Sequence, residues 1–431
     1  MELRPVCKQT DVGVIPEDWE SRELQELGSW KGGATPSMQN KDFWVGGTIP
    51  WAASGDVKSI SISDTELHVT ESAVERTSTT LVPEESIIVV TRSGILRKYL
   101  PVATNRVQLA INQDLKALIP RSGIVSGFVL QSLVANGPRI LATCLKSGTT
   151  VESIEFPWLK AYQIPVPPSP HEQAAIAAVL SDMDALIASL DRLIAKKRNI
   201  KQAAMQQLLT GKIRLPGFGG EPGYKNTEAR VIPEDWDVGN LGDCLNQPPK
   251  YGINAPAAPY QDGLPVYIRI TDITDDGRFS PEKISSVEAC DTEGYFLSNG
   301  DLVFARTGAS VGKSYLYDPK DGPMVFAGFL IKVRPSQSCL LPGFLAAYAT
   351  TGHYWNWVAA MSTRSGQPGI NGHEYCELPI PLPPVPEQRA IVEVLSHMRM
   401  EIAALEARRD KTMALKQGMV QELLTGRIRL I

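Results

Sequence analysis

The sequence predicts an α+β protein in which two mixed α/β domains are each followed by one long helix, as an internal repeat. Three observations predict this class. The chain has 431 residues, more than one hydrophobic core usually supports. The same landmarks occur twice in the same order, and Ile391 stands 215 positions after its counterpart Ile176. Short β-like runs fill the segment before each predicted helix.

The composition is that of an ordinary globular protein, with 43% hydrophobic and 21% charged residues. The formal net charge of −4 argues against a protein that coats nucleic acid through bulk charge, because such binding requires the neutralisation of many phosphates. A local basic surface remains compatible with this net charge.

The six cysteines stand singly, without a C-x-x-C pair or a histidine at ligand spacing. Neither a disulfide framework nor a zinc site is indicated, and a reducing compartment is expected. The N-terminal stretch MELRPVCKQTDVG lacks the basic flank and apolar run of a signal peptide. We expect a soluble, cytoplasmic protein that does not insert into a membrane.

The first domain is expected at residues 1–165, and the second at residues 216–381. The first contains the β-like run ESIIVVTRSG and the helical pattern SGFVLQSLVANGPRILATCL. The second contains the β-like runs LPVYIRITDI, GDLVFARTG and AGFLIKVRP, and the helical pattern PGFLAAYATTGHYWNWV. Because the two segments differ strongly in sequence, we expect two domains that have diverged.

A long helix is expected within residues 166–215 and again within 382–431. Each follows a proline-rich strip, PVPPSP or PLPPVP, whose last proline suits the first turn of a helix. An acidic residue, Glu172 or Glu387, then favours the positively polarised N-terminus. Each pattern ends at LLTG, where a glycine suits a left-handed C-terminal cap.

The apolar residues of each predicted helix form a single stripe. They alternate steps of four and three, the spacing of a coiled-coil seam: Ile176, Leu180, Met183, Ile187, Leu190 and Ile194 in the first copy, and Ile391, Leu395, Met398, Ile402 and Leu405 in the second. A helix from Glu172 to Thr210 would be about 58 Å long. A stripe of this length needs a partner, and the other copy matches it. The alternative is that each helix lies on its own domain.

Patterns that could carry catalytic chemistry fail on spacing or context. TGASVGKS has three residues between Gly308 and Gly312, whereas a phosphate-binding loop needs four. NQPPK resembles the catalytic loop of adenine methyltransferases, but Gln247 interrupts it. The five histidines stand in separate segments without a nucleophile motif. We therefore expect no covalent chemistry by this chain and no bound metal.

Two charged motifs are interpreted as structural. VIPEDWE and VIPEDWD are nearly identical at matched positions, which suits a structural lead-in with Trp19 and Trp236 packed better than a metal site. KKRNIK, from Lys196 to Lys201, could contact phosphate or dock a partner, but a solvated face is the preferred interpretation.

Together the two halves resemble the DNA-specificity (S) subunit of type I restriction-modification systems, the HsdS family. The resemblance covers essentially the whole chain. It rests on the paired VIPEDW motifs, on IPVPPSPHEQAAI and IPLPPVPEQRAI, on the LLTG endings, and on PPKYGINA, YIRITDIT, GDLVFARTGASVGKS and STRSGQPGIN in the second domain. The first domain matches through VVTRSGILRKYL and LAINQDLKALIP, whereas KGGATPS replaces the Lys-Tyr-Gly form.

This resemblance implies two target recognition domains on a pseudo-twofold frame, separated by two antiparallel coiled-coil helices. Each domain would recognise one half of a bipartite, asymmetric site in double-stranded DNA. The implied partners are two methyltransferase (M) subunits, which bind S-adenosylmethionine, and restriction/translocase (R) subunits, which use ATP and magnesium. The complex would be an adenine-specific methyltransferase and ATP-dependent endonuclease, while this chain would be non-catalytic and bind no cofactor.

Base recognition favours Arg, Lys, Asn and Gln, while Lys, Ser and Thr also hold phosphates. Arg92 and Arg306 are the principal candidates, because each follows a β-like run and precedes a small hydroxyl residue and glycine. The further candidates are Ser93, Arg97, Lys98, Asn112 and Gln113 in the first domain, and Lys250, Tyr251, Arg269, Thr307, Lys313, Arg364 and Gln367 in the second. For each of them, an exposed or salt-bridged surface residue is the alternative.

Two other functions are compatible with parts of the sequence. A helical adaptor could assemble proteins through its globular domains without recognising DNA. A self-contained methyltransferase or nuclease is the least favoured, because the motifs that such an enzyme needs are missing.

Overall fold

The computed structural model describes residues 6–146, 151–219, 223–227, 231–288, 292–363 and 367–430. The chain divides into two compact units. The first comprises Met1–Asp191 with Ala407–Ile431, and the second comprises Arg192–Glu406. Each unit therefore contains one globular domain and part of both long helices.

The domain of the first unit contains two main sheets. The larger has the order β4-β12-β9-β10-β6, in which β6 pairs parallel with β10 and the other pairs are antiparallel. The smaller has the order β7-β5-β11-β8. The strands are β4 (Gly28–Gly32), β5 (Ile49–Ala52), β6 (Ser61–Ile62), β7 (Leu67–Val69), β8 (Leu81–Val82), β9 (Ile87–Val90), β10 (Val102–Asn105), β11 (Leu109–Ile111) and β12 (Leu115–Pro120).

The second unit has a similar arrangement of two sheets, each of four strands, with a different sequence. One sheet has the order β17-β24-β21-β22, and the other has the order β18-β20-β19-β23. In the second of these sheets β19 pairs parallel with the edge strand β23, as β5 pairs parallel with β11 in the first unit. The strands are β17 (Lys250–Tyr251), β18 (Ala258–Pro259), β19 (Val266–Ile268), β20 (Ser285–Ser286), β21 (Leu302–Ala305), β22 (Ser314–Leu316), β23 (Met324–Phe326) and β24 (Leu330–Val333).

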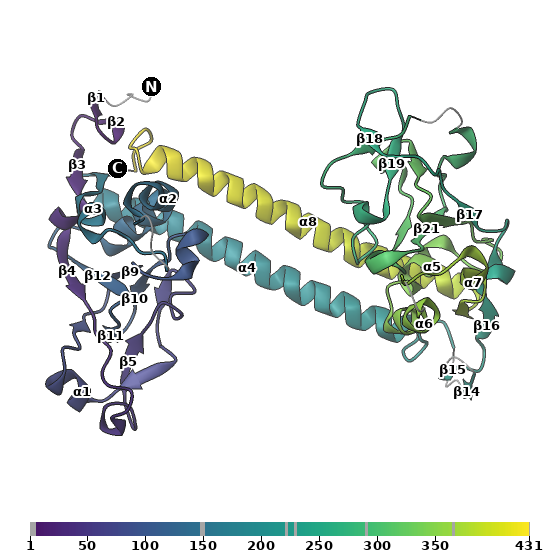
Figure 1. The fold of residues 1–431 in the computed structure, drawn as a ribbon, viewed down its shortest axis with the longest axis horizontal. Coiled ribbons are helices and arrows are strands. Elements are labelled where there is room, and N and C mark those ends of the chain that lie inside the picture. The colour runs from purple at the N-terminus through teal and green to yellow at the C-terminus, as the bar shows by residue number, and fades with distance from the viewer. Residues whose placement is uncertain are drawn as a thin grey trace. The chain divides into compact units, whose positions relative to one another are not determined.

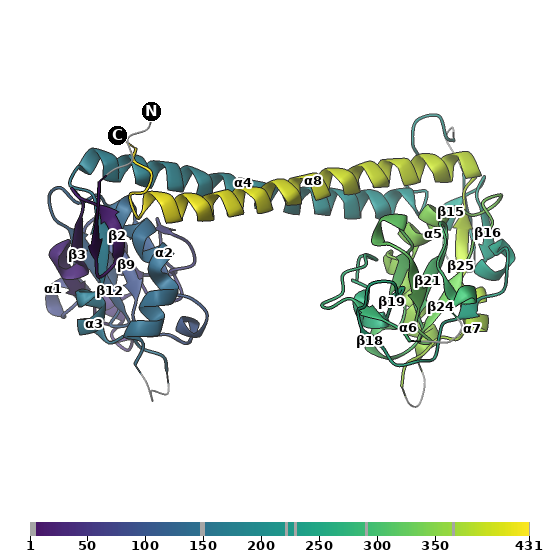
Figure 2. The ribbon, with the colours of Figure 1, turned by 90° about the horizontal axis from the view of Figure 1, so that it is seen from above.

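The central strands β9 and β21 are buried on both faces, which explains why they are uninterrupted apolar runs. Successive side chains of a strand point to opposite faces. Ile87 and Val89 accordingly join a core with helix α2 (Ser126–Cys144), which lies against β9 (Figure 2). Ile88 and Val90 join the core beneath the smaller sheet. In the second unit β21 alternates in the same way.

Shorter elements complete each domain. The remaining helices are α1 (Glu71–Arg76), α3 (Phe156–Ala161), α5 (Pro342–Tyr348), α6 (Gly352–Ser362) and α7 (Gly372–Cys376). Two-stranded sheets join β1 (Cys7–Thr10) to β2 (Gly13–Pro16), β3 (Glu20–Glu23) to β13 (Gln163–Val166), β14 (Tyr224–Asn226) to β15 (Val231–Pro233), and β16 (Asp237–Asn240) to β25 (Pro379–Leu382). The strands β13 and β25 lead directly into the long helices.

The two long helices have equal length. Helix α4 extends over Pro170–Leu208 and helix α8 over Val385–Leu423, 39 residues each. Beyond their ends Gly211 and Gly426 have φ of 70° and 71°, which confirms the left-handed conformation expected at these glycines. A Cβ at Gly211 would lie 2.5 Å from Pro233 of the second VIPEDW motif, and a Cβ at Gly426 would meet Pro16 of the first at the same distance.

The repeated motifs meet in one polar cluster per unit, which we call the anchor cluster. In the second unit Arg214 donates to Asp235 at 2.8 and 2.9 Å and to Glu387 at 2.6 Å, and it stacks on the indole of Trp236. Its side chain is 9% exposed, and that of Glu387 is 1% exposed. The hydrogen bonds that Arg214 donates to Asp235 and Glu387 raise the pKa of Arg214, so it remains charged.

The first unit contains the same anchor cluster. Arg429 donates to Asp18 at 2.9 Å and to Glu172 at 2.8 Å, and it stacks on Trp19. Both tryptophans are fully buried, as the sequence predicted for the VIPEDW motifs. In each unit, the segment that follows the end of one long helix is thus bound to the first turn of the other helix.

Within each unit the two helices lie side by side and antiparallel (Figure 1). In the first unit Lys416 pairs with Asp184 at 2.5 Å, and Arg409 pairs with Asp191 at 3.5 Å. In the second unit Lys197 of α4 pairs with Glu401 of α8 at 2.6 Å.

The apolar stripes divide between two kinds of contact. Ile176 and Leu180 enter the core of the first domain together with Leu423 of α8, and Ile391 and Leu395 enter the second core together with residues at the end of α4. Part of each stripe therefore packs on the domain that precedes its helix, as the alternative interpretation expected, and part lies with the other long helix, as the paired-helix interpretation expected. Of the remaining stripe residues, Leu190, Ile194 and Ile402 are buried, whereas Met183, Ile187, Met398 and Leu405 are partly buried.

Among the described residues, α4 is long and apolar enough to cross a membrane by length and composition. Its residues Ile176 and Leu180 are fully buried in the core of the first unit. The apolar stripe of α4 therefore serves packing within the protein.

Candidate nucleic-acid interface

The principal candidates lie where the central strands β9 and β21 end. The segment after β9 is fixed by a bond from the Ile154 amide to the Thr91 carbonyl at 2.8 Å, and the segment after β21 by a bond from the Ile370 amide to the Arg306 carbonyl at 2.9 Å. Thr91, and not Arg92, is therefore the structural counterpart of Arg306.

The sequence analysis chose Arg92 and Arg306 for their similar sequence context, and the structure shows that they do not occupy matched positions. Arg92 and Thr307 form corresponding isolated bridges, with Ser153 and with Gly369. The two arginines are thus one residue out of register, although each precedes a hydroxyl residue and a glycine. Because successive residues of an extended chain point to opposite faces, Arg92 and Arg306 present their charges differently.

Arg306 lies on an aromatic support. Its guanidinium carbon is 4.8 Å from the centre of the Tyr251 ring, and the Tyr251 hydroxyl accepts a hydrogen bond from the Gly372 amide at 2.9 Å. No carboxylate within the described ranges forms an ion pair with Arg306. A planar guanidinium held on a ring keeps its N–H edge available for bidentate contacts, such as those to guanine.

Other predicted residues of the second domain gather around Arg306. Lys250 precedes Tyr251, donates to the Gly294 carbonyl at 2.6 Å and lies 4.3 Å from the centre of the Tyr295 ring. Thr307 follows Arg306. Gln367 also approaches this segment, since a Cβ placed on Gly308 would lie 3.1 Å from its side-chain nitrogen. We call Lys250, Tyr251, Arg306, Thr307 and Gln367 the Arg306 cluster.

Three predicted residues of the second domain do not join this cluster. Arg269 forms two bonds with Asp272, at 3.0 and 2.8 Å, and hydrogen bonding to Asp272 raises the pKa of Arg269. Lys313 pairs with Asp275 at 2.9 Å. Each of these two cations is therefore paired with a carboxylate, Asp272 or Asp275. Arg364 lies outside the described residues.

In the first domain, two predicted residues are exposed at the corresponding edge. Arg92 is exposed, and its amide donates to the Asp114 carbonyl at 3.2 Å. Gln113 is exposed, and its side-chain oxygen accepts a hydrogen bond from the Thr35 hydroxyl at 2.6 Å. Arg92 and Gln113 are thus neighbours, with Thr35 from the KGGATPS segment beside them.

The other candidates of the first domain have structural partners. Ser93 accepts a bond from the Ile95 amide and begins a short 3-10 turn. Arg97 pairs with Glu152 and lowers the pKa of that carboxyl group. Lys98 is exposed. Asn112 is 6% exposed and accepts a bond from the Asp114 amide at 3.0 Å, so in this structure its amide group serves a turn rather than the surface.

The segments KGGATPS and PPKYGINA occupy the same place despite their different sequences. The residue after Gly33 bonds to the Ile111 carbonyl at 3.0 Å, and the residue after Gly252 bonds to the Phe326 carbonyl at 2.9 Å. A Cβ at either glycine would lie within 2.3 Å of a carbonyl oxygen of the neighbouring strand, so both positions require glycine. The tyrosine that supports Arg306 is replaced by Gly32.

The sequence analysis missed two exposed residues beside these candidates. Lys31 corresponds to Lys250 and is exposed; matching the glycines of the two copies would have found it. Phe329 is 58% exposed, and its carbonyl accepts the Arg306 amide at 3.0 Å. An exposed aromatic ring at such an edge can contact a thymine methyl group.

The described residues contain no group of three or more His, Cys, Asp or Glu side chains that could hold a metal ion. The residues at the ends of β9 and β21 provide positive charge, amide groups and aromatic rings. This chemistry suits hydrogen bonding to bases and phosphates more than bond-making catalysis.

Comparisons with known proteins show the family of this chain. The family model described as the type I restriction modification DNA specificity domain matches residues 16–197 and 233–412. The specificity subunit of the type I restriction enzyme MjaIX of Methanocaldococcus jannaschii is 34% identical over 255 residues, which cover 58% of this chain and 56% of that protein. The EcoR124I/EcoR124II specificity subunit of Escherichia coli is 37% identical over 183 residues, covering 42% and 45%. The chain thus spans about half the length of each of these two relatives.

The fold also has solved counterparts. The crystal structure of the type I restriction-modification S subunit from M. genitalium superposes with a TM-score of 0.60 at 15% identity. The superposition covers 98% of this chain and 99% of that one.

Proposed function

Because this chain belongs to the type I restriction modification DNA specificity family, we propose that it is the DNA-recognition subunit of a type I restriction-modification complex. Each domain recognises one half of a bipartite, asymmetric site in double-stranded DNA. The chain itself catalyses no reaction. In the proposed complex, S-adenosylmethionine is bound by methyltransferase subunits, and ATP and magnesium by restriction subunits.

One observation supports the assignment of a different half-site to each domain. The two domains share the arrangement around their central strands β9 and β21 and matching backbone contacts there, yet they carry different side chains at the same edge. The second domain has Arg306 supported by Tyr251. At the corresponding positions the first domain has Thr91 and Gly32, and it presents Arg92 and Gln113 instead. Equal frames with unequal hydrogen-bonding groups are what an asymmetric target requires.

The Arg306 cluster is proposed as the base-reading group of the second domain, with Lys250 and Thr307 toward phosphates. In the first domain Arg92 and Gln113 are proposed for bases, with Lys98 toward phosphates, whereas Arg97 would first have to leave Glu152. Arg269 and Lys313 would first have to leave Asp272 and Asp275, so they are expected to contribute less.

The paired helices are proposed as the spacer between the half-sites and as the docking surface for two methyltransferase subunits. Support comes from their antiparallel pairing within each unit and from exposed apolar side chains at corresponding positions. Ile200 of α4 is 44% exposed in the second unit, and Leu415 of α8 is 57% exposed in the first. Because each unit has one member of this matched pair of exposed apolar residues, the arrangement suits the docking of one methyltransferase subunit on each unit.

A footprint of the purified complex with its methyltransferase partner tests this proposal. Protection of two short DNA segments with a fixed unprotected gap is expected. Protection of a single continuous segment would contradict the two-domain assignment. An adaptor that does not recognise DNA predicts that duplex DNA changes neither the elution volume nor the thermal stability of the complex.

A further inference from the structure

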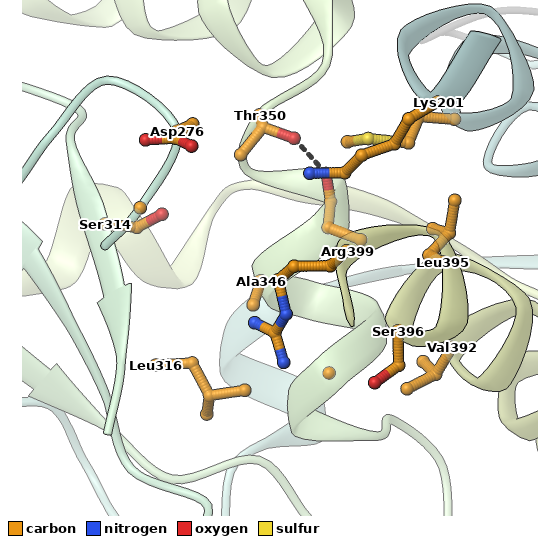
Figure 3. Close-up of a pocket in the computed structure, with 14 residues that line it drawn as sticks. Lys201, Asp276, Ser314, Leu316, Ala346, Thr350, Val392, Leu395, Ser396 and Arg399 are labelled. Carbon is orange, nitrogen blue, oxygen red and sulfur yellow. Dashed lines mark hydrogen bonds between the residues drawn. The ribbon is translucent and has the colours of Figure 1, made fainter. Parts of the chain in front are cut away.

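The second unit contains a small pocket that the proposed DNA recognition does not use. Its volume is about 170 Å³, and it lies between the last turns of α4, the first half of α8, helix α5, strand β22 and the loop at Asp276. Lys201 of α4 and Arg399 of α8 both point into this space (Figure 3). Hydroxyl groups of Ser314 and Ser396 also line it.

Neither cation forms an ion pair among the described residues, although the carboxylate of Asp276 also lines the pocket. The nearby carboxylate of Asp276 pairs with Arg278 at 2.9 Å, and Glu406 pairs with Arg198. Burial lowers the pKa of Lys201, an effect that Asp276 opposes and Arg399 reinforces. Lys201 is half-buried and Arg399 is exposed, and two like charges held near each other disfavour each other unless an anion joins them.

The first unit provides an internal comparison, because matching hydrogen bonds fix which residues correspond. The side-chain oxygen of Gln173 accepts the Val125 amide at 2.9 Å, and that of Gln388 accepts the Leu341 amide at 2.9 Å. Along the helices this correspondence places Lys416 where the second unit has Lys201.

At the matching place in the first unit the lysine is paired with a carboxylate. Lys416 pairs with Asp184 at 2.5 Å, and Gln131 donates to the other oxygen of Asp184 at 3.0 Å. In the second unit the counterpart of Asp184 is Arg399, and the counterpart of Gln131 is Ala347. The second unit therefore replaces a carboxylate with a cation, and a long amide with a methyl group that leaves space.

We infer that the pocket of Lys201 and Arg399 binds an oxyanion group, a phosphate or a carboxylate. The oxyanion takes the place that the Asp184 carboxylate has in the first unit. The lysine supplies a point charge, and the guanidinium supplies a fork of N–H donors that matches an oxyanion. A pocket of this volume accepts a single such group, since sites for drug-sized ligands begin at about 300 Å³.

Calorimetric titration of the full-length chain with inorganic phosphate tests this inference, with chloride at the same ionic strength as the reference. The double variant Ala347→Gln with Arg399→Asp rebuilds the arrangement of the first unit. We expect this variant to bind phosphate at least about tenfold more weakly than the unmodified chain, because a charge-assisted contact is lost. Phosphate binding of unchanged affinity in this variant, or no phosphate binding by the unmodified chain, would overturn the inference.

Two further variants guard against misfolding and nonspecific charge effects. Arg399→Gln removes the charge without introducing a new one, and the same weakening of phosphate binding is expected. Arg389→Gln removes an exposed arginine of α8 that does not line the pocket, and no change is expected. Equal weakening by Arg399→Gln and Arg389→Gln would mean that phosphate senses only overall charge, which would also overturn the inference.

The oxyanion can come from solution or from a partner protein, and the assembled complex distinguishes these sources. If phosphate weakens association of the methyltransferase subunit with the unmodified chain but not with Arg399→Gln, a carboxylate of the partner occupies the pocket. If phosphate leaves association unchanged, the ligand is a free oxyanion. Both results keep the inference. Phosphate binding by the isolated chain requires no DNA, so its failure is separate from a failure of the proposed DNA recognition.

Discussion

Replacing Arg214 with methionine removes the centre of the anchor cluster in the second unit and leaves the carboxylate of Glu387 buried without its partner. The side chain of Glu387 is 1% exposed and that of Arg214 is 9% exposed, so solvent weakens their interaction little. Removing one member of a buried, hydrogen-bonded ion pair typically costs about 3–5 kcal/mol. For a unit of this size that loss corresponds to a fall in melting temperature of roughly 6–20 °C.

Differential scanning calorimetry of the full chain measures this change. Hydrogen exchange at the end of α4 and the beginning of α8 should show that the loss is local to the anchor cluster. The matched control is Lys212→Ala, two residues earlier and exposed, which should change stability by less than about 0.5 kcal/mol. A double variant Arg214→Met with Glu387→Gln should recover part of the loss, because no buried charge then remains unpaired. An Arg214→Met protein with the same melting temperature as the unmodified chain would refute this reasoning.

Further predictions concern recognition, backbone and acid stability. Arg306→Ala should weaken binding to DNA by about 1–3 kcal/mol and relax specificity in one half-site, while Arg92→Ala should affect the other half-site; competition binding with single-base variants of the site separates this result from uniform loss of phosphate contacts. Gly211→Ala should destabilise the chain by more than the ~1 kcal/mol typical of a left-handed alanine, because its Cβ would also meet Pro233 at 2.5 Å; urea unfolding measures this, and an unchanged midpoint would be inconsistent with the packing described. Hydrogen bonds from the arginines lower the pKa of Asp18 and Asp235, so their stabilisation is complete above the ordinary value of 3.8 and is lost as the pH falls through the lowered values; Arg214→Met should reduce the acid-dependent loss of unfolding free energy. Insertion of seven residues at corresponding positions of α4 and α8 should lengthen the spacer by about 10 Å, or about three base pairs, and leave the bases of both half-sites unchanged in a footprint.

The sequence was most informative where a feature depends on local spacing. The internal repeat, the proline-led starts of the helices and the glycines after their ends follow from patterns within a few residues of each other. The left-handed conformation of Gly211 and Gly426 confirms this kind of prediction. The packing of Trp19 and Trp236 could also be predicted, because nearly identical motifs at matched positions indicated a shared structural role.

Features that depend on distant contacts could not be predicted in the same way. Arg214 and Glu387 are 173 residues apart, so nothing local to either residue indicates their ion pair. The order of the strands likewise depends on pairing between remote segments. The division of each apolar stripe between a domain core and the other helix is a tertiary choice that helical spacing does not specify.

Several details of the candidate interface also depended on the tertiary fold. The one-residue difference in register between Arg92 and Arg306 is set by hydrogen bonds to remote segments, and the hydroxyl and glycine that follow each arginine do not indicate it. The burial of Asn112 results from a turn to Asp114, and residue type alone did not distinguish this role from an exposed one.

The central claim is that one frame, used twice, presents two different sets of base-reading side chains. Mapping methylated adenines at single-base resolution in a host that expresses this chain with its methyltransferase partner tests this claim most directly. The account predicts a motif with two dissimilar specific segments and a gap of constant length, in which Arg306→Ala relaxes one segment and leaves the other unchanged. A single continuous motif, or relaxation of both segments by that one substitution, would contradict it.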